Sequence, residues 1–129
     1  MDSKNSILIV DDEPALAKTL VMIFERAGYT AEAVFSGEEA MAWITDRAPS
    51  LVITDVIMPG MDGIELAKRV RESYPDCQIL LFSGNAETQD LLEAAQQEGR
   101  EFEILAKPVP PQQLIIKVAS MLNESRPWQ

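Results

Sequence analysis

The chain has 129 residues, 47% of them hydrophobic, and its 11 basic and 21 acidic residues give a net charge of −10. This length and composition predict a single globular domain with a substantial core. The acidic balance argues against nonspecific binding to nucleic acid or anionic membranes. The sequence has neither a signal-peptide pattern nor an apolar run of membrane-spanning length. We therefore expect a soluble cytoplasmic protein with no direct nucleic-acid or membrane partner.

Two residue types limit the available chemistry. The chain has no histidine and a single cysteine, Cys77. These counts exclude an internal disulfide, an imidazole base, a phosphohistidine and a zinc site built from cysteine and histidine. Cys77 and Trp43 are interpreted as packing residues. Any chemistry must therefore be carried by carboxylates.

Short runs rich in β-branched residues and leucine alternate with segments of helical periodicity. The predicted strands are 7–10, 30–35, 51–54, 79–82 and 103–106. The apolar positions that define the five helices are, in chain order, Leu16, Leu20, Ile23, Phe24 and Ala27; Ala40, Trp43 and Ile44; Leu66, Ala67 and Val70; Leu91, Leu92 and Ala95; and Leu114, Ile115, Val118 and Leu122. This fivefold alternation predicts an α/β protein, a doubly wound (βα)₅ domain around a parallel sheet.

Local signals mark the ends of these helices. Pro14 and Pro111 suit the first turn of a helix. Ser36 with Glu39 and Asp62 with Glu65 have capping-box spacing, and Gly28 and Gly99 suit helix ends. The domain is expected to span residues 1–124, with an exposed tail at 125–129.

Polar side chains follow four of the five strands. Asp11 and Asp12 follow the first strand, Asp55 the third, Ser83 the fourth and Lys107 the fifth. In a doubly wound sheet, ligands bind outside the carboxyl ends of the strands. Three crowded carboxylates repel one another unless they are solvated or share a cation, and an all-oxygen cluster favours Mg²⁺. We therefore predict a magnesium site at this edge of the sheet.

The same cluster fits phosphoryl transfer. An ionised aspartate such as Asp55 can attack phosphorus without a general base. Lys107 would supply a cation and Ser83 a hydroxyl donor to the transferred group, and Gly60 and Gly84 would let the backbone approach it.

Each residue alone has a simpler explanation. Asp11 and Asp12 could cap a helix, Asp55 could begin a turn, Ser83 could form a loop, and Lys107 could be a solvated surface residue. Their joint placement at strand ends favours a site.

Three segments together carry a family resemblance: 7–13 (ILIVDDE), 52–63 (VITDVIMPGMDG) and 105–108 (LAKP). With them the chain resembles the receiver domains of bacterial two-component response regulators, in particular the single-domain chemotaxis-like type. The resemblance implies a flavodoxin-like fold with strand order 2-1-3-4-5. It also implies that a sensor histidine kinase or phosphotransfer protein phosphorylates Asp55. Mg²⁺ would be bound directly by Asp12 and Asp55, through water by Asp11, and by the backbone carbonyl of Ile57.

The resemblance also implies how the signal leaves the site. Lys107 would pair with the phosphoryl group, Ser83 would move to bond it, and the Lys107–Pro108 peptide would be cis. The surface formed by the fourth helix, fifth strand and fifth helix would then meet a downstream target or output domain, or a second copy of the chain. The domain would catalyse only its own phosphorylation and dephosphorylation.

Two positions depart from the family pattern. Ile104 occupies the place of the aromatic switch residue, so Phe102, two residues earlier on the same face, is an alternative for that role. Ile57 is apolar where many relatives are polar, which leads us to expect a long-lived phosphoryl group. Two other functions compete with the receiver: a Mg²⁺-dependent aspartyl-phosphate phosphatase of the haloacid dehalogenase class, and a structural module that has lost phosphorylation.

Overall fold

The computed structural model describes residues 5–84 and 102–122. Its elements are β1 (Ser6–Val10), α1 (Pro14–Arg26), β2 (Thr30–Val34), α2 (Gly37–Asp46), β3 (Leu51–Asp55), α3 (Gly63–Ser73), β4 (Gln78–Ser83), β5 (Glu103–Ala106) and α5 (Pro111–Met121). The five strands form one parallel sheet in the order β2-β1-β3-β4-β5. The predicted fold class and strand order are confirmed. The fourth predicted helix, with Gly99, lies outside the described residues.

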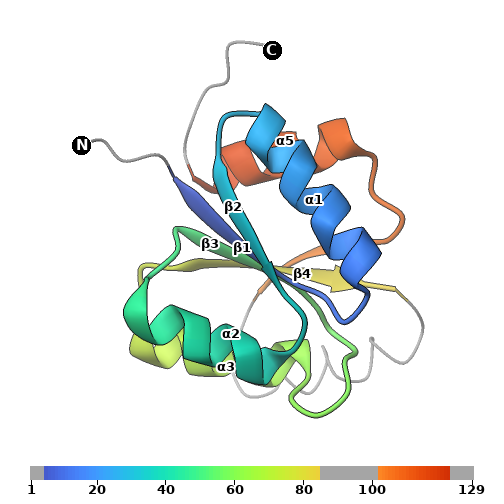
Figure 1. The fold of residues 1–129 in the computed structure, drawn as a ribbon. Coiled ribbons are helices and arrows are strands. Elements are labelled where there is room, and N and C mark those ends of the chain that lie inside the picture. Colours follow the sequence, from blue (N-terminus) through green and yellow to red (C-terminus); the bar gives the residue numbers. More distant parts are fainter. Residues whose placement is uncertain (1–4, 85–101, 123–129) are drawn as a thin grey trace.

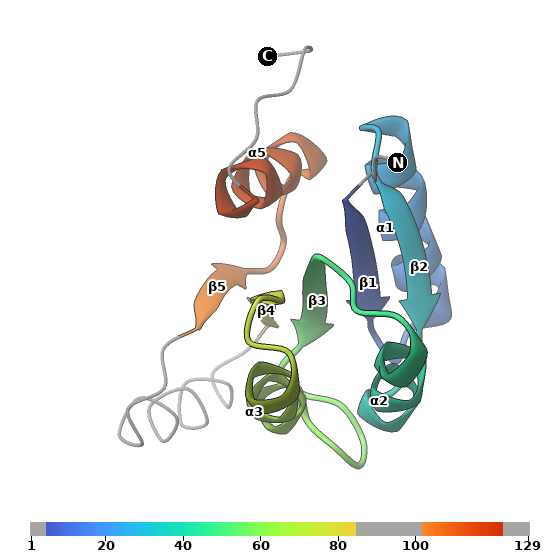
Figure 2. The ribbon, with the colours of Figure 1, turned by 90° about the vertical axis from the view of Figure 1, so that its left-hand side faces the viewer.

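The sheet is covered on both faces. Helices α1 and α5 lie on one face and α2 and α3 on the other (Figures 1 and 2). Two apolar clusters fill the layers: one holds Leu8, Val52 and Leu81 against α2 and α3, and the other holds Ile9 and Ile53 against α1 and α5. Alternate residues of each central strand thus enter opposite clusters, which explains their continuous apolar runs.

The helix-start signals form as predicted. Ser36 Oγ accepts a hydrogen bond from Glu39 N at 3.0 Å, and Asp62 Oδ1 accepts one from Glu65 N at 2.8 Å. Prolines open α1 and α5, and Gly28 follows α1 with a φ of 99°. The two side-chain caps and the prolines mark where these helices begin, and Gly28 marks where α1 ends.

The predicted strands match those in the structure to within one residue at each end. The second strand was expected to include Phe35, but β2 ends at Val34. The reason is local: Phe35 N donates to Glu39 Oε1 at 3.1 Å, so its amide belongs to the cap of α2. Among the described residues, no helix has both the length and the apolar character needed to cross a membrane.

Candidate functional site

The sheet register brings the predicted acidic residues together. Asp55 is the last residue of β3, and Val10 at the end of β1 pairs with Thr54. Asp11 and Asp12 continue from Val10 in the parallel direction, so they emerge beside Asp55. One carboxylate oxygen from each of the three aspartates lies within 4.8 Å of the others. Among the described residues, these carboxylates therefore form an oxygen-only group that could hold a metal ion.

Lys107 joins the carboxylates from the edge strand β5. It follows β5, and its backbone amide donates to the Ser83 carbonyl at 2.9 Å, which fixes its position beside the end of β4. Its Nζ lies 2.9 Å from Asp55 Oδ2, 2.8 Å from Asp55 Oδ1 and 3.8 Å from Asp11 Oδ2. The ammonium group thus contacts both oxygens of Asp55.

Asp11 is the most confined of these carboxylates, with 1% of its surface exposed. Burial raises its pKa above the ordinary value of 3.8, and repulsion from Asp55 and Asp12 acts in the same direction. The hydrogen bond from Glu13 N, at 2.9 Å, and the Lys107 charge oppose that rise in pKa. An ionised Asp11 is therefore incompletely compensated, which is the condition that a bound cation relieves.

The loop between β3 and α3 is closed tightly beneath Asp55. Gly63 N donates to the Val56 carbonyl at 2.8 Å. A Cβ at Gly63 would lie 2.0 Å from the Asp55 carbonyl oxygen, so only glycine fits this position. Ile57, two residues after Asp55 in the same loop, is 40% exposed. The structure therefore places Ile57 on the surface of the loop that follows β3.

Comparison with known proteins shows similarity to one family over nearly the whole chain. The family model described as the response regulator receiver domain matches residues 7–119. The receiver protein CpdR of Brucella abortus is 34% identical over 116 residues, covering 90% of this chain and 95% of CpdR. This chain belongs to the response regulator receiver family. Its function is that of a receiver domain, whose family role is to accept a phosphoryl group, and this sets aside the phosphatase alternative.

Other relatives differ in length and agree in fold. The chain is 30% identical to the phosphate regulon regulator PhoB of Pseudomonas aeruginosa, covering 95% of this chain but about half (53%) of PhoB. A CheY-like receiver protein from Methanospirillum hungatei has a TM-score of 0.83 at 28% identity, covering 94% of this chain and 95% of that one. The chemotaxis protein CheY4 of Vibrio cholerae has a TM-score of 0.80 at 27% identity, covering 92% and 98%.

The structure also describes the other residues that the sequence predicted for this receiver site. Ser83 ends β4 and is half-buried, and its backbone carbonyl accepts the hydrogen bond from Lys107 N. A Cβ at Gly84 would meet only Lys107 Cδ, at 3.8 Å, so a side chain would fit there. Gly60 has a φ of 73°, and the Lys107–Pro108 peptide is cis. The helix-cap explanation fits Asp11 in part, because its Oδ1 accepts from Glu13 N, whereas Glu13, at the N-cap of α1, makes no side-chain cap.

The two candidates for the aromatic switch lie in different surroundings. Ile104, on edge strand β5, is 36% exposed. Phe102 precedes β5, packs against the α2–α3 cluster and has the Arg71 guanidinium 4.4 Å from its ring centre. Phe102 is thus held against α3, whereas Ile104 is open to contact.

Sequence reasoning overlooked two residues that bond to Asp55 or to the loop that follows it. Thr54 is fully buried, and its Oγ1 donates to the Asp55 carbonyl at 3.0 Å and lies 3.9 Å from Met58 Sδ. A lone hydroxyl in an otherwise apolar strand was the available signal. Glu38, on α2, accepts from Met61 N at 3.1 Å, a contact 23 residues away for which the sequence gives no signal.

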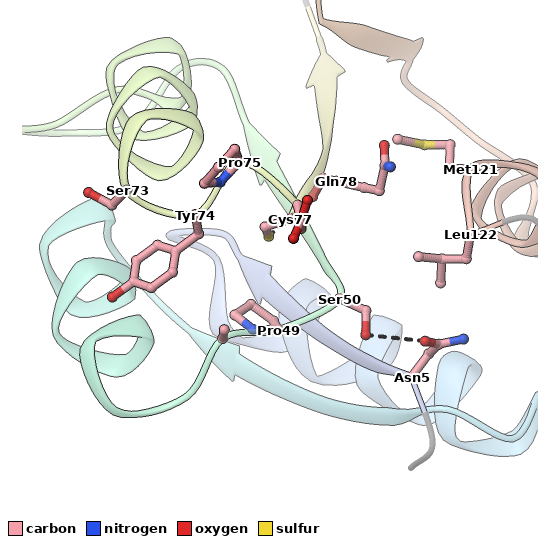
Figure 3. Close-up of a pocket in the computed structure, with 12 residues that line it drawn as sticks. Asn5, Pro49, Ser50, Ser73, Tyr74, Pro75, Cys77, Gln78, Met121 and Leu122 are labelled. Atoms are coloured by element: carbon pink, nitrogen blue, oxygen red, sulfur yellow. Dashed lines mark hydrogen bonds between the residues drawn. The ribbon is translucent and has the colours of Figure 1, made fainter. Parts of the chain in front are cut away.

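A hollow of about 700 Å³ lies at the opposite end of the strands from the carboxylates. Asn5, Ser50, Cys77, Gln78 and Leu122 are among its lining residues, and Ser50 Oγ donates to Asn5 Oδ1 (Figure 3). It belongs to the amino-terminal ends of the strands, so it takes no part in the site described above.

Proposed function

We propose that Asp55 is the phosphoryl acceptor of this receiver and that Asp11, Asp12, Asp55 and the Ile57 carbonyl hold Mg²⁺ beside it. The observation that carries the proposal is the approach of three carboxylates to within 4.8 Å, with the Lys107 ammonium on both oxygens of Asp55. The all-oxygen donor set fits Mg²⁺, and the incompletely compensated charge of Asp11 favours a cation there. When bound, Mg²⁺ neutralises the oxygens of the incoming phosphoryl group.

In the transfer step, an oxygen of the Asp55 carboxylate attacks phosphorus. A new O–P bond forms, and the bond from phosphorus to the donor atom breaks, so that the donor leaves with the electron pair and Asp55 becomes an acyl phosphate. Lys107 turns from the Asp55 carboxylate to the new phosphoryl oxygens, and the Ser83 hydroxyl donates to another of them. The domain catalyses this step and the later hydrolysis on itself alone.

The donor is a sensor histidine kinase or a phosphotransfer protein in the cytoplasm. The phosphoryl charge draws Ser83 and Lys107 inward, and the change passes to β5 and α5, where Ile104 and neighbouring residues meet a downstream protein, an output domain or a second copy. This route is supported by the Lys107 N–Ser83 carbonyl bond, which joins the ends of β4 and β5 at the site.

Ile57 controls how long the phosphoryl group persists. Its side chain is 40% exposed and directly follows the Asp55–Val56 segment, where a polar residue would instead orient a water for attack. An apolar side chain gives such a water no hydrogen bond, so the phosphoryl group is long-lived.

Intact-protein mass spectrometry after incubation with acetyl phosphate tests the proposal. The wild-type protein is expected to gain one phosphoryl group in the presence of Mg²⁺ and none in EDTA, and Asp55→Asn is expected to gain none. If acetyl phosphate gives no gain, a panel of phosphorylated histidine kinases provides the second donor. No transfer from either donor would leave the structural module as the function.

A further inference from the structure

The loop of residues 56–62, which joins β3 to α3, rests at its tip on the first turn of α2. Glu38 Oε2 accepts a hydrogen bond from Met61 N at 3.1 Å. A Cβ built at Gly37 would lie 2.9 Å from Met61 Cβ, and one at Gly60 would lie 2.9 Å from Glu38 Oε2. Two glycines therefore allow the helix and the loop to approach closely enough for this bond to form.

The two acidic residues in the first turn of α2 have different partners. Glu39 belongs to its own helix end, because its Oε1 accepts from Phe35 N and its amide donates to Ser36 Oγ. Glu38 is exposed and reaches out of its helix to the loop. Its side chain therefore contributes little to the core, and it bonds instead to the loop that follows Asp55.

The loop is fixed at its base and at its tip, and Ile57 lies between. At the base, Gly63 N donates to the Val56 carbonyl at 2.8 Å. At the tip, Glu38 holds the Met61 amide. Releasing the tip would let the segment around Ile57 sample other backbone conformations, at a cost in entropy each time its carbonyl must point at a metal ion.

We propose that Glu38 is a positioning residue for the magnesium site: through the Met61 amide it holds the loop so that the Ile57 carbonyl is presented to the ion. The inference rests on the proposed function, which makes that carbonyl a metal ligand. It extends the site to α2, beyond the carboxylates and Lys107.

The test compares Glu38→Ala and Glu38→Gln with the wild type and with Glu25→Ala, a control that removes an exposed carboxylate from α1. Isothermal titration calorimetry measures Mg²⁺ binding to the unphosphorylated proteins, and amide hydrogen exchange measures protection at Met61 without metal. Glu38→Ala is expected to raise the Kd for Mg²⁺ by roughly threefold to tenfold, the effect of losing one orienting hydrogen bond, and to speed exchange at Met61. Glu38→Gln, whose amide oxygen accepts the same bond, and Glu25→Ala are expected to match the wild type.

The glutamine variant separates position from charge. Equal weakening of Mg²⁺ binding in Glu38→Ala and Glu38→Gln would show that Glu38 acts only as a distant negative charge, and would overturn the inference. An unchanged Kd in Glu38→Ala would overturn it as well. Both results leave the proposed function standing, whereas a wild-type protein that binds no Mg²⁺ would refute the proposed function itself.

Discussion

Replacing Asp11 by asparagine is expected to stabilise the metal-free receiver at neutral pH. The substitution removes one of three crowded charges and keeps an oxygen that can accept the 2.9 Å hydrogen bond from Glu13 N. At an effective dielectric constant of about 20, an attraction to Lys107 at 3.8 Å amounts to about 4.4 kcal/mol, and a repulsion from Asp55, which lies within 4.8 Å, to at least about 3.5 kcal/mol. The repulsion therefore offsets most or all of the attraction.

What remains is the lost hydration of a buried carboxylate and its repulsion from Asp12, both of which disfavour ionised Asp11. We expect Asp11→Asn to raise the free energy of unfolding by about 1–2 kcal/mol in EDTA, and Tm by roughly 3–8 °C. Because the folded-state pKa of Asp11 is raised, the folded state binds the proton more tightly than the unfolded state. The stability that protonation gives the wild type is full below pH 3.8 and is lost as pH rises through the raised pKa.

The assay is calorimetric Tm against pH, with EDTA and with Mg²⁺. In EDTA the two proteins are expected to converge in Tm at low pH and to diverge toward neutral pH, with the variant more stable. Mg²⁺ at a hundred times its Kd would stabilise the wild type by about 2.7 kcal/mol and the variant by much less. A variant less stable than the wild type in EDTA at pH 7.5 would refute the electrostatic reasoning.

Three further predictions concern the loop, the lifetime of the phosphoryl group and the cysteine. Gly63→Ala is expected to lower the free energy of unfolding by about 3 kcal/mol, because the alanine Cβ would meet the Asp55 carbonyl oxygen at 2.0 Å. Gly84→Ala, the control, should change the free energy of unfolding little. Equal urea midpoints for the two variants would contradict this prediction. Ile57→Asn is expected to shorten the half-life of the phosphoryl group, measured by mass spectrometry as the loss of phosphorylated protein over time. An unchanged half-life would contradict the proposed role of Ile57. Burial raises the pKa of the Cys77 thiol to about 11. Native Cys77 should therefore react with a thiol reagent at pH 8 about a hundredfold more slowly than in urea, and equal rates would show an accessible thiolate.

Much of the fold could be predicted because periodicity and caps agree with each other. The run at 51–54 is apolar on both faces of a central strand, and it ends at the acidic residue that the site needs. The joint position of Asp11, Asp12 and Asp55 followed from topology, because parallel strands deliver their carboxyl ends to one edge.

The contacts that sequence reasoning missed are the ones that depend on tertiary approach. Glu38 and Met61 are 23 residues apart, and their contact depends on how close two glycines let a helix and a loop come. Phe102 shows the same limit. Period-two geometry places it on the face of Ile104, but its contact with Arg71 depends on where α3 lies.

The most direct test of the account is to locate the phosphoryl group chemically. After phosphorylation with Mg²⁺, borohydride reduces an aspartyl phosphate to homoserine, and peptide mass spectrometry then finds the modified position. The account predicts homoserine at position 55 and nowhere else, and no homoserine when EDTA replaces Mg²⁺. Homoserine at another aspartate, or a phosphoryl group that resists borohydride, would contradict the assignment of Asp55 as the acceptor.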